Sequence, residues 1–191
     1  GHNGAGKTTL LRMLNGEFSP DLGTLTVQGQ RSSLIDLTGG FSQTMTGREN
    51  IYFRGAHLGF DRAFLKSKEE EIIEFTELGD FIDSPIKTYS SGMLLRLGFA
   101  VTVLSEPDVL LVDEILSVGD FLFSAKCMRK MNELKRRAAI VQVSHVVEEI
   151  INFADHALVL DRGAPVFFGR PAEAAAYYLK LEQAKAELGG S

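Results

Sequence analysis

Several features are scarce in this sequence, and each absence excludes a class of protein. Cys127 is the only cysteine among the 191 residues, so no disulfide can form within the chain, and a reducing compartment fits. We interpret Cys127 as a small apolar residue on a helix and not as a reactive thiol. The longest apolar candidates, residues 97–104 and 109–112, fall far short of the roughly 18–20 residues that a membrane-spanning helix needs. We therefore expect that the chain itself does not enter the bilayer.

An excess of positive charge is also absent. The formal net charge is −5 and the isoelectric point is near 5.4. A basic face is the usual footprint of proteins that bind nucleic acid or anionic lipid without specificity, so the composition argues against both partners. With 45% apolar residues, a chain of 191 residues buries the core of one sizeable domain. We expect a single domain over residues 1–191.

The first eight residues match a phosphate-binding pattern. Gly1, four further residues, and then Gly6, Lys7 and Thr8 give G-x-x-x-x-G-K-[ST], the loop whose backbone amides and lysine hold the phosphates of a nucleotide. The next segment has helical apolar spacing and ends in a glycine, so we expect the positive end of a helix to face the phosphates. The pattern alone suits a kinase, a GTPase or a motor, and a chance glycine-rich turn is the alternative.

Each group in this loop has an expected task. Lys7 neutralises the β- and γ-phosphates, Thr8 places its hydroxyl on Mg²⁺, and the backbone N–H groups of residues 4–9 supply the remaining contacts. A strand should precede such a loop, and the sequence begins within the loop. We therefore expect a fragment that lacks its opening strands.

The rest of the chain alternates between strand and helix patterns. Strands are expected at residues 23–30 (antiparallel), 107–114, 138–145, 156–163 and 164–169, and helices at about 48–59, 66–78, 92–106, 121–137, 146–154 and 171–188, with a loop at 37–47. Two faces are assigned as well: Glu69, Glu70 and Glu71 as a solvated first helical turn, and Phe121, Ala125, Met128, Met131 and Leu134 as an apolar stripe. Strands alternating with helices predict a parallel α/β core, into which the helical run from about 45 to 106 is inserted as a subdomain.

Two of the expected strands end in residues suited to hydrolysis. Asp113 follows a buried apolar run and is placed to hold Mg²⁺ through water, and Glu114 comes directly after it. An acid here is what hydrolysis needs, because a base must orient and polarise the water that attacks the γ-phosphate. His145 ends the next strand, where it would sense the γ-phosphate. The alternatives are a solvated loop start for the acids and a structural role for the histidine.

A second anion site is predicted far along the chain. Ser90, Ser91 and Gly92 lie at the start of an apolar helix, so a hydroxyl, backbone amides and the positive end of the helix dipole point outward. Because the site is remote from the first one, the economical explanation is that it serves a nucleotide bound on another subunit. Ordinary N-capping by serine is the alternative.

Taken together, these motifs resemble those of the ATP-binding cassette ATPases. GHNGAGKTT resembles their Walker A loop, YSSGM their signature, VLLVDE their Walker B strand, SVGD at 117–120 their D-loop, and SH at 144–145 their switch histidine. The resemblance implies a P-loop NTPase fold and a head-to-tail homodimer that closes on ATP and Mg²⁺. It implies nucleotide contacts from Gly1, Asn3, Gly4, Ala5, Gly6, Lys7, Thr8 and Thr9 of one copy and from Ser90, Gly92 and Asp120 of the other, Mg²⁺ held by Thr8 and Asp113, and catalysis by Lys7, Glu114 and His145.

Longer stretches resemble the branch of this family that exports polysaccharides. LTGGF, TGRENIY, FIDSPIKTYSSGM and VDEILSVGDFLF carry this resemblance. It implies an ATPase that powers export of O-antigen, capsule or teichoic acid. The partners would be two integral-membrane permease subunits, docked near residues 37–47, and through them a lipid-linked glycan. The ATPase would then lie at the cytoplasmic face of the membrane.

The sequence also departs from the common family pattern. Tyr89, Ser91 and Met93 replace Leu, Gly and Gln in the signature, so only Ser90 and Gly92 carry over directly. Leu37 occupies the usual Q-loop position, and Gln43 is offset from it.

Two other functions are weighed against export. A cassette ATPase acting on nucleic acid or ribosomes usually carries two cassettes or long coiled-coil insertions, and no stretch here sustains heptads. A binding or regulatory module would keep the nucleotide but not its hydrolysis, and Glu114 and His145 oppose that interpretation.

Overall fold

The computed structural model of the protein describes residues 1–2, 4–113 and 120–189. The chain forms two compact units, one made of residues 1–19 and 142–191 and the other of residues 20–141. We call them the smaller and the larger unit. Among the described residues, no helix combines the length and the apolar character that crossing a membrane requires.

The larger unit is built on parallel strands. β1 (Arg31–Ser33) pairs in parallel with β2 (Val109–Asp113), so that Ser32 lies opposite Leu110. β3 (Ala139–Val143) completes a sheet with the order β1-β2-β3. Parallel neighbours need a long crossover connection, and three helices lie between β1 and β2 in the chain. The prediction of a parallel α/β fold is confirmed.

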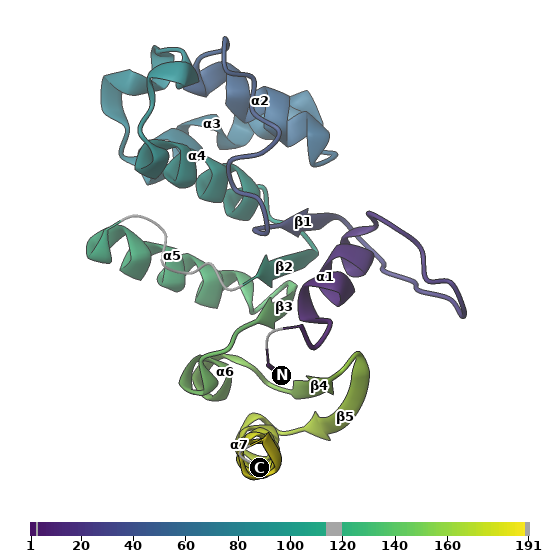
Figure 1. The fold of residues 1–191 in the computed structure, drawn as a ribbon. Coiled ribbons are helices and arrows are strands. Elements are labelled where there is room, and N and C mark those ends of the chain that lie inside the picture. The colour runs from purple at the N-terminus through teal and green to yellow at the C-terminus, as the bar shows by residue number, and fades with distance from the viewer. Residues whose placement is uncertain (3, 114–119, 190–191) are drawn as a thin grey trace. The chain divides into compact units, whose positions relative to one another are not determined.

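These three helices pack on one another (Figure 1). They are α2 (Gly47–His57), α3 (Arg62–Thr76) and α4 (Ser91–Leu104), and the short 3₁₀ helices η1 (Gly79–Asp83) and η2 (Ile86–Thr88) join α3 to α4. Buried apolar residues from all three, such as Ile51, Ile72 and Leu97, form one core cluster. α4 contacts α2, α3, α5 and β1. Contact on several sides explains why its second half, residues 97–104, is entirely buried and reads as an almost continuous apolar run.

α5 (Phe121–Leu134) is the predicted amphipathic helix, but the predicted stripe is wrong in part. The buried residues are Phe123, Cys127, Met131 and Leu134. Phe121 is 85% exposed, Ala125 is exposed and Met128 is only half-buried. Both sets have helical spacing, so the sequence pattern cannot distinguish them until the packing partners are known. The interpretation of Cys127 as a buried apolar residue is confirmed.

Two further local expectations are wrong. Residues 23–30 form a largely exposed loop, with which no described strand pairs. An alternating pattern does not hold a strand by itself, because the ladder hydrogen bonds need a partner. The acidic residues 69–71 are not a first turn, since α3 begins at Arg62 behind the N-cap Asp61, whose side chain accepts a hydrogen bond of 2.8 Å from the Phe64 N–H.

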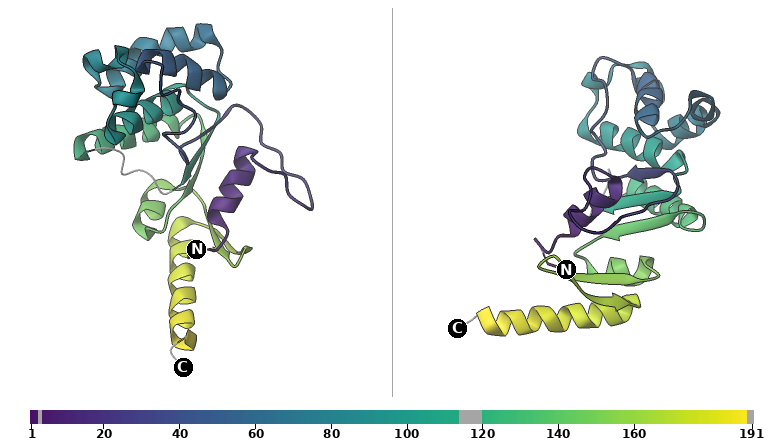
Figure 2. Two further views of the ribbon diagram at one scale, coloured as in Figure 1. Left: turned by 45° about the horizontal axis from the view of Figure 1, so that its top comes forward. Right: turned by 90° about the vertical axis from the view of Figure 1, so that its right-hand side faces the viewer.

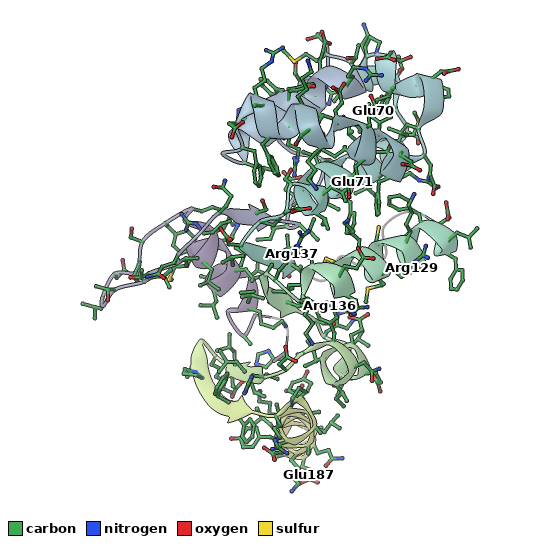
Figure 3. The ribbon with its side chains drawn as sticks, turned by 180° about the vertical axis from the view of Figure 1, so that it is seen from behind. Glu70, Glu71, Arg129, Arg136, Arg137 and Glu187 are labelled. Carbon is green, nitrogen blue, oxygen red and sulfur yellow. The ribbon has the colours of Figure 1, made fainter. Side chains whose placement is uncertain are left out.

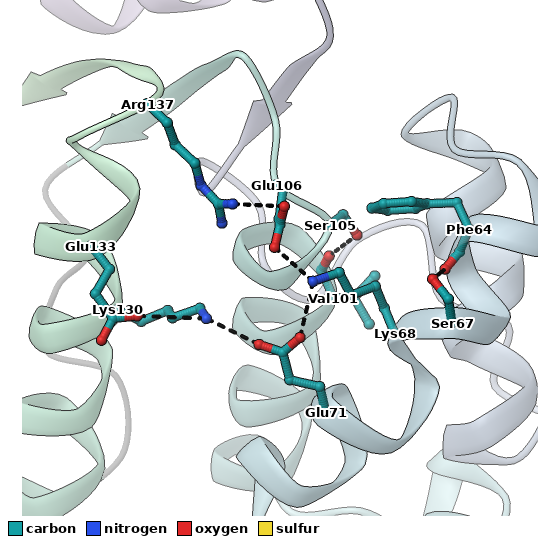
Figure 4. Close-up of polar contacts among 10 residues, drawn as sticks. All are labelled: Phe64, Ser67, Lys68, Glu71, Val101, Ser105, Glu106, Lys130, Glu133 and Arg137. Atoms are coloured by element: carbon teal, nitrogen blue, oxygen red, sulfur yellow. Dashed lines mark hydrogen bonds and ion pairs between the residues drawn. The ribbon is translucent and has the colours of Figure 1, made fainter.

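Two of these acidic residues instead join networks of ion pairs within the larger unit. Glu69 accepts hydrogen bonds from Arg48 and Tyr52. Glu71 lies between two lysines, with Lys68 Nζ at 3.1 Å and Lys130 Nζ at 3.0 Å from its carboxylate oxygens (Figure 4). Figure 3 shows the side chains of this unit, with Glu71 and Arg137 labelled.

Glu106 extends the second network beyond the end of α4. Its carboxylate accepts hydrogen bonds of 2.6 Å from Lys68 and 2.7 Å from Arg137. Burial acts to raise the pKa of Glu106, but these two cations outweigh it and hold the pKa below its ordinary value of 4.5. The ion pairs therefore join α3, the end of α4 and the segment after α5.

This lowered pKa predicts an acid-dependent loss of stability. A carboxylate whose pKa is depressed in the folded state stabilises fully above its unfolded pKa, and the contribution is lost as pH falls through the folded pKa. We expect Glu106→Gln to lower the free energy of unfolding by about 1–2 kcal/mol at pH 7 and by much less at pH 3, as measured by urea titration. Glu133→Gln is the matched control, because its side chain is 66% exposed and lies 3.7 Å from Lys130. If Glu106→Gln lowered the free energy of unfolding equally at both pH values, the stabilisation would not come from the charge of Glu106, and the explanation would be wrong.

The smaller unit begins and ends with helices. α1 (Lys7–Asn15) follows the phosphate-binding pattern, α6 (Val147–Phe153) follows β3, and β4 (Ala157–Asp161) pairs antiparallel with β5 (Ala164–Gly169). α7 (Pro171–Gly189) packs against α6, β4 and β5, and Figure 2 shows it along its length. These elements agree with the predicted ones.

Candidate functional site

The phosphate loop leads directly into α1, as the mechanism requires. Gly4 and Gly6 have φ angles of +79° and +95°, a backbone conformation that side chains disfavour. Gly6 is the N-cap of α1 and has no side chain to cap the first amides of the helix. Beside Gly4, no described heavy atom beyond its chain neighbours lies within 4 Å of the position a side-chain carbon would take. An open loop before the positive end of a helix is suited to bind phosphate groups.

Lys7 is held inside this loop. Its ammonium group donates hydrogen bonds to the carbonyl oxygens of Gly1, at 2.6 Å, and His2, at 3.0 Å. Ala5 is fully buried, and its carbonyl oxygen accepts a hydrogen bond of 3.1 Å from the Gly163 N–H in the turn after β4. The turn between β4 and β5 thus holds the loop through this backbone hydrogen bond. Asn3, which the sequence predicts to contact the nucleotide, lies outside the described residues.

Asp161 and Lys185 were missed by the sequence analysis, although they brace the same loop. Asp161 Oδ1 is 2.9 Å from Nε2 of His2 and accepts a hydrogen bond of 2.6 Å from Lys185 on α7. Lys185, followed by His2, lowers the pKa of this carboxyl group. His2 and Asp161 are separated by 159 positions in the sequence, and no local motif marks the pair.

His145 follows β3 in an exposed turn of the smaller unit. The turn is fixed by its neighbour Ser144, whose hydroxyl donates to Glu149 at 2.7 Å and accepts from the Val146 N–H at 3.0 Å. His145 itself is exposed, as a residue that contacts a ligand from outside must be. Its contact with the γ-phosphate stays a prediction.

Asp113 is the last residue of β2 in the larger unit. The three residues before it, Leu110, Leu111 and Val112, are fully buried and anchor the strand, whereas Asp113 is half-buried at its carboxyl end. Glu114 lies outside the described residues, so its role as a base stays a prediction.

The signature residues lie at the exposed start of α4. Ser90 is the N-cap, and its hydroxyl oxygen accepts a hydrogen bond of 3.2 Å from the Met93 N–H. Ordinary N-capping is therefore present, but Ser90 and Ser91 both remain exposed. Gly92 is open as well, since the nearest atom to an added side-chain carbon would be the Ser90 hydroxyl oxygen at 3.9 Å. The helix start faces outward and is free of steric cover at Gly92.

Asp120 begins α5 as its N-cap. Its carboxylate accepts one hydrogen bond of 3.0 Å from the Phe123 N–H and another of 2.5 Å from Arg96 of α4. The Phe123 amide and then Arg96 lower the pKa of Asp120. Arg96 also pairs with Glu77 at 2.9 Å, so the end of α3, α4 and the start of α5 share one charge cluster. These contacts all lie within one chain, so the contact of Asp120 with a second copy stays a prediction.

The loop at residues 37–47 is fixed by α2. Arg54 is only 5% exposed and donates hydrogen bonds to the carbonyl oxygens of Asp36, at 2.9 Å, and Gly39. Leu37, at the usual Q-loop position, is 2% exposed, and its carbonyl oxygen lies against Gly98, where a side-chain carbon would overlap it. Gln43 is exposed.

The predicted site residues are thus divided between the units. The phosphate-loop residues and His145 belong to the smaller unit, and Asp113, Ser90, Gly92 and Asp120 belong to the larger one. Each described residue lies at an element boundary: the start of α1, the end of β2 or β3, or the start of α4 or α5.

Comparison with known protein families matches residues 1–117 to the family described as ABC transporter. The chain is 44% identical over 182 residues to the ABC transporter protein AbcA of Aeromonas salmonicida, which covers 95% of this chain and 59% of that protein. It is 45% identical to the O-antigen export system ATP-binding protein RfbB of Myxococcus xanthus, over 93% of this chain and 41% of that protein. It is 40% identical to the teichoic acids export ATP-binding protein TagH of Lactococcus lactis, over 96% of this chain and 39% of that protein. The chain therefore spans less than two thirds of the length of these relatives.

Solved structures show the same fold at low sequence identity. The ATP binding subunit of an ABC transporter superimposes with a TM-score of 0.81 at 20% identity, over 98% of this chain and 85% of that one. A dimeric ATP-binding cassette in a post-hydrolysis state, bound to ADP and Pi, gives a TM-score of 0.71 at 16% identity, over 89% of this chain and 82% of that one.

Proposed function

The chain belongs to the ABC transporter family, and from this premise we propose that it is the ATP-hydrolysing part of an exporter for lipid-linked polysaccharide of the O-antigen, capsule or teichoic acid class. The proposed substrate class rests on one observation. ATP-binding proteins named for O-antigen export and for teichoic acids export are 45% and 40% identical to this chain over more than nine tenths of its length. Two different polymers among the names of the relatives support a polymer exporter without selecting one polymer.

The proposal assigns the first contacts with ATP to the phosphate loop. Lys7 binds the β- and γ-phosphates, and the amides of residues 4–9 surround them. Two glycines with positive φ and an uncapped helix start give this loop the open shape that close approach of phosphate requires. Asn3 and Ala5 contribute through the same stretch of backbone.

Mg²⁺ is the cofactor of the proposed reaction, and it would neutralise charge on the phosphate oxygens. Thr8 and Asp113 are the residues assigned to hold it. A hydroxyl and a single carboxylate suit an ion that keeps several waters and takes its other ligands from phosphate.

Hydrolysis is assigned to Glu114 and His145. Glu114 accepts the proton of the attacking water, and His145 holds the γ-phosphate and so distinguishes the triphosphate from the product. Positioning and charge stabilisation supply most of the rate enhancement in phosphoryl transfer. We therefore assign these two residues to a site that is active only when it is closed.

A second copy of the chain closes the site. Ser90 and Gly92 of that copy bring the exposed start of α4 to the γ-phosphate, and Asp120 connects the two sites of the homodimer. Both the exposure of Ser90 and Ser91 and the open space at Gly92 support this assignment, because a ligand from another molecule needs an accessible helix start.

Two integral-membrane subunits are the remaining partners. They would contact residues 37–47, which we call the docking segment, and place the ATPase at the cytoplasmic face of the membrane. Closure and separation of the ATPase pair would then move the lipid-linked glycan through the membrane subunits.

The test is reconstitution of the full chain with its membrane subunits in lipid vesicles. We expect the membrane subunits to stimulate ATP hydrolysis severalfold and ATP to drive the lipid-linked glycan across the vesicle membrane. Vesicles with the membrane subunits alone are the control. Hydrolysis that responds to nucleic acid or ribosomes, and not to the membrane subunits, would contradict the proposal.

A further inference from the structure

The docking segment and the residues before the signature are joined by backbone hydrogen bonds. The Ile86 N–H donates to the Met45 carbonyl at 3.0 Å, the Lys87 N–H to the Gln43 carbonyl at 3.2 Å, and the Gly47 N–H to the Ser84 carbonyl at 3.3 Å. Thr46 and Pro85 form an antiparallel bridge between these bonds. The ladder ends three residues before Ser90, the N-cap of α4.

Tyr89 lies in the short segment between this ladder and Ser90. Its side chain is buried, with 8% exposed, and its hydroxyl donates a hydrogen bond of 2.6 Å to the Phe81 carbonyl. The same hydroxyl lies against Gly47, where a side-chain carbon would overlap it. Burial raises the pKa of Tyr89 to about 12, so the hydroxyl keeps its proton and remains a donor at neutral pH. Leucine, which stands here in the common signature pattern, has no hydroxyl to make this contact.

α2 also fixes the docking segment. Asn50 is fully buried, and its amide group donates to the carbonyl oxygens of Ser42, Met45 and Thr46 at 3.0, 3.2 and 2.9 Å. Its side-chain oxygen accepts a hydrogen bond of 2.8 Å from the Ser42 N–H. Thr46 and Glu49 add a reciprocal capping box at the start of α2. Residues 42–47 are therefore held both by the ladder and by α2.

We propose that Tyr89 is a positioning residue that makes the docking segment and the capped start of α4 one rigid body. A displacement of the docking segment then moves Ser90 directly, without a flexible link between them. The structural part stands on the contacts above, and the functional part rests on the proposed function, because it takes the membrane subunits as the source of the displacement. Tyr89 itself touches no nucleotide in this arrangement and acts through Ser90.

The structural part is tested by amide hydrogen exchange on the full chain. Tyr89→Phe removes the hydroxyl and keeps the ring. We expect exchange at Ile86, Lys87 and Met93 to speed up together, by about fivefold, which corresponds to the loss of one hydrogen bond. Tyr52→Phe is the matched control, because its hydroxyl also donates within this unit, at 2.5 Å to Glu69, which forms none of the ladder hydrogen bonds. If exchange became faster at Ile86 and Lys87 but kept its rate at Met93, or if no rate changed, the proposal would be overturned.

A second pair of variants tests the fit at Gly47. Gly47→Ala should destabilise the protein strongly while the Tyr89 hydroxyl is present, since the added methyl group overlaps it. The Tyr89→Phe/Gly47→Ala double variant should lose less stability than the sum of the two single changes, although Ile82 also lies 3.0 Å from the added carbon and keeps part of the cost. Strict additivity in thermal unfolding would contradict a direct contact between these positions.

The functional part is read from ATP hydrolysis with and without the membrane subunits. In Tyr89→Phe we expect the ratio of hydrolysis with the membrane subunits to hydrolysis by the ATPase alone to fall by about fivefold or more, beyond any change in the hydrolysis by the ATPase alone. Tyr52→Phe should keep the full stimulation. Retained stimulation in Tyr89→Phe would overturn the inference. If the unsubstituted protein shows no stimulation, the proposed function fails instead, and the exchange experiment still decides the structural part.

Discussion

Replacing Glu114 by Gln is expected to slow ATP hydrolysis by roughly 10²–10⁴-fold, the contribution typical of a positioned general base. The amide has the size of the carboxylate but cannot accept the proton of the attacking water. ATP binding should persist, because the phosphate loop supplies its own contacts through Lys7 and the amides after it. The measurement is phosphate release at saturating ATP, together with nucleotide affinity by calorimetry.

The control for this substitution is Glu148→Gln. Glu148 is an exposed acid in the first turn of α6 and has no assigned role in hydrolysis. Its variant should hydrolyse ATP at the unsubstituted rate. A Glu114→Gln protein that keeps more than half of the original rate would remove Glu114 from the mechanism.

Lys7→Ala is expected to weaken ATP binding by about 10–100-fold and to abolish hydrolysis. The ammonium group supplies charge-assisted hydrogen bonds to the phosphates, which are among the stronger contacts available in such a site. It also bonds the Gly1 and His2 carbonyls, so its removal loosens the loop that carries the amides. Both effects lower the affinity for ATP.

Titration with ATP by calorimetry measures this loss. Lys180→Ala, an exposed lysine on α7, is the control for a general loss of positive charge and should bind ATP normally. A Lys7→Ala protein with unchanged affinity would mean that the phosphates bind elsewhere.

Features defined by neighbouring residues were predictable from the sequence. The phosphate loop with α1, the apolar helix α4 behind Ser90 and the hairpin of β4 and β5 each follow from a short motif or period, and the structure has them at the predicted places. Capping of α4 by a serine, which was the alternative interpretation of this helix start, belongs to the same class, because a cap bonds an amide only two or three residues further on.

Features defined by distant partners were not predictable. The buried face of α5 is set by Phe123 and Cys127 packing inward, whereas Phe121 fits the same helical period and is exposed. Glu71 is exposed, as expected, but its ion pair with Lys130 was not predicted, because the two residues are 59 positions apart in the sequence. The same holds for Asp161 beside His2 and for Tyr89 against Gly47, whose contacts exist only after the chain has folded.

The decisive question is whether two copies join only when ATP lies between them, and the mass of the Glu114→Gln protein in solution answers it. Light scattering on the full chain with saturating MgATP should give twice the monomer mass, and without nucleotide, or with added ADP, it should give the monomer mass. A Glu114→Gln protein that binds ATP and stays monomeric at saturation would contradict the assignment of Ser90 and Gly92 to the nucleotide of a second copy.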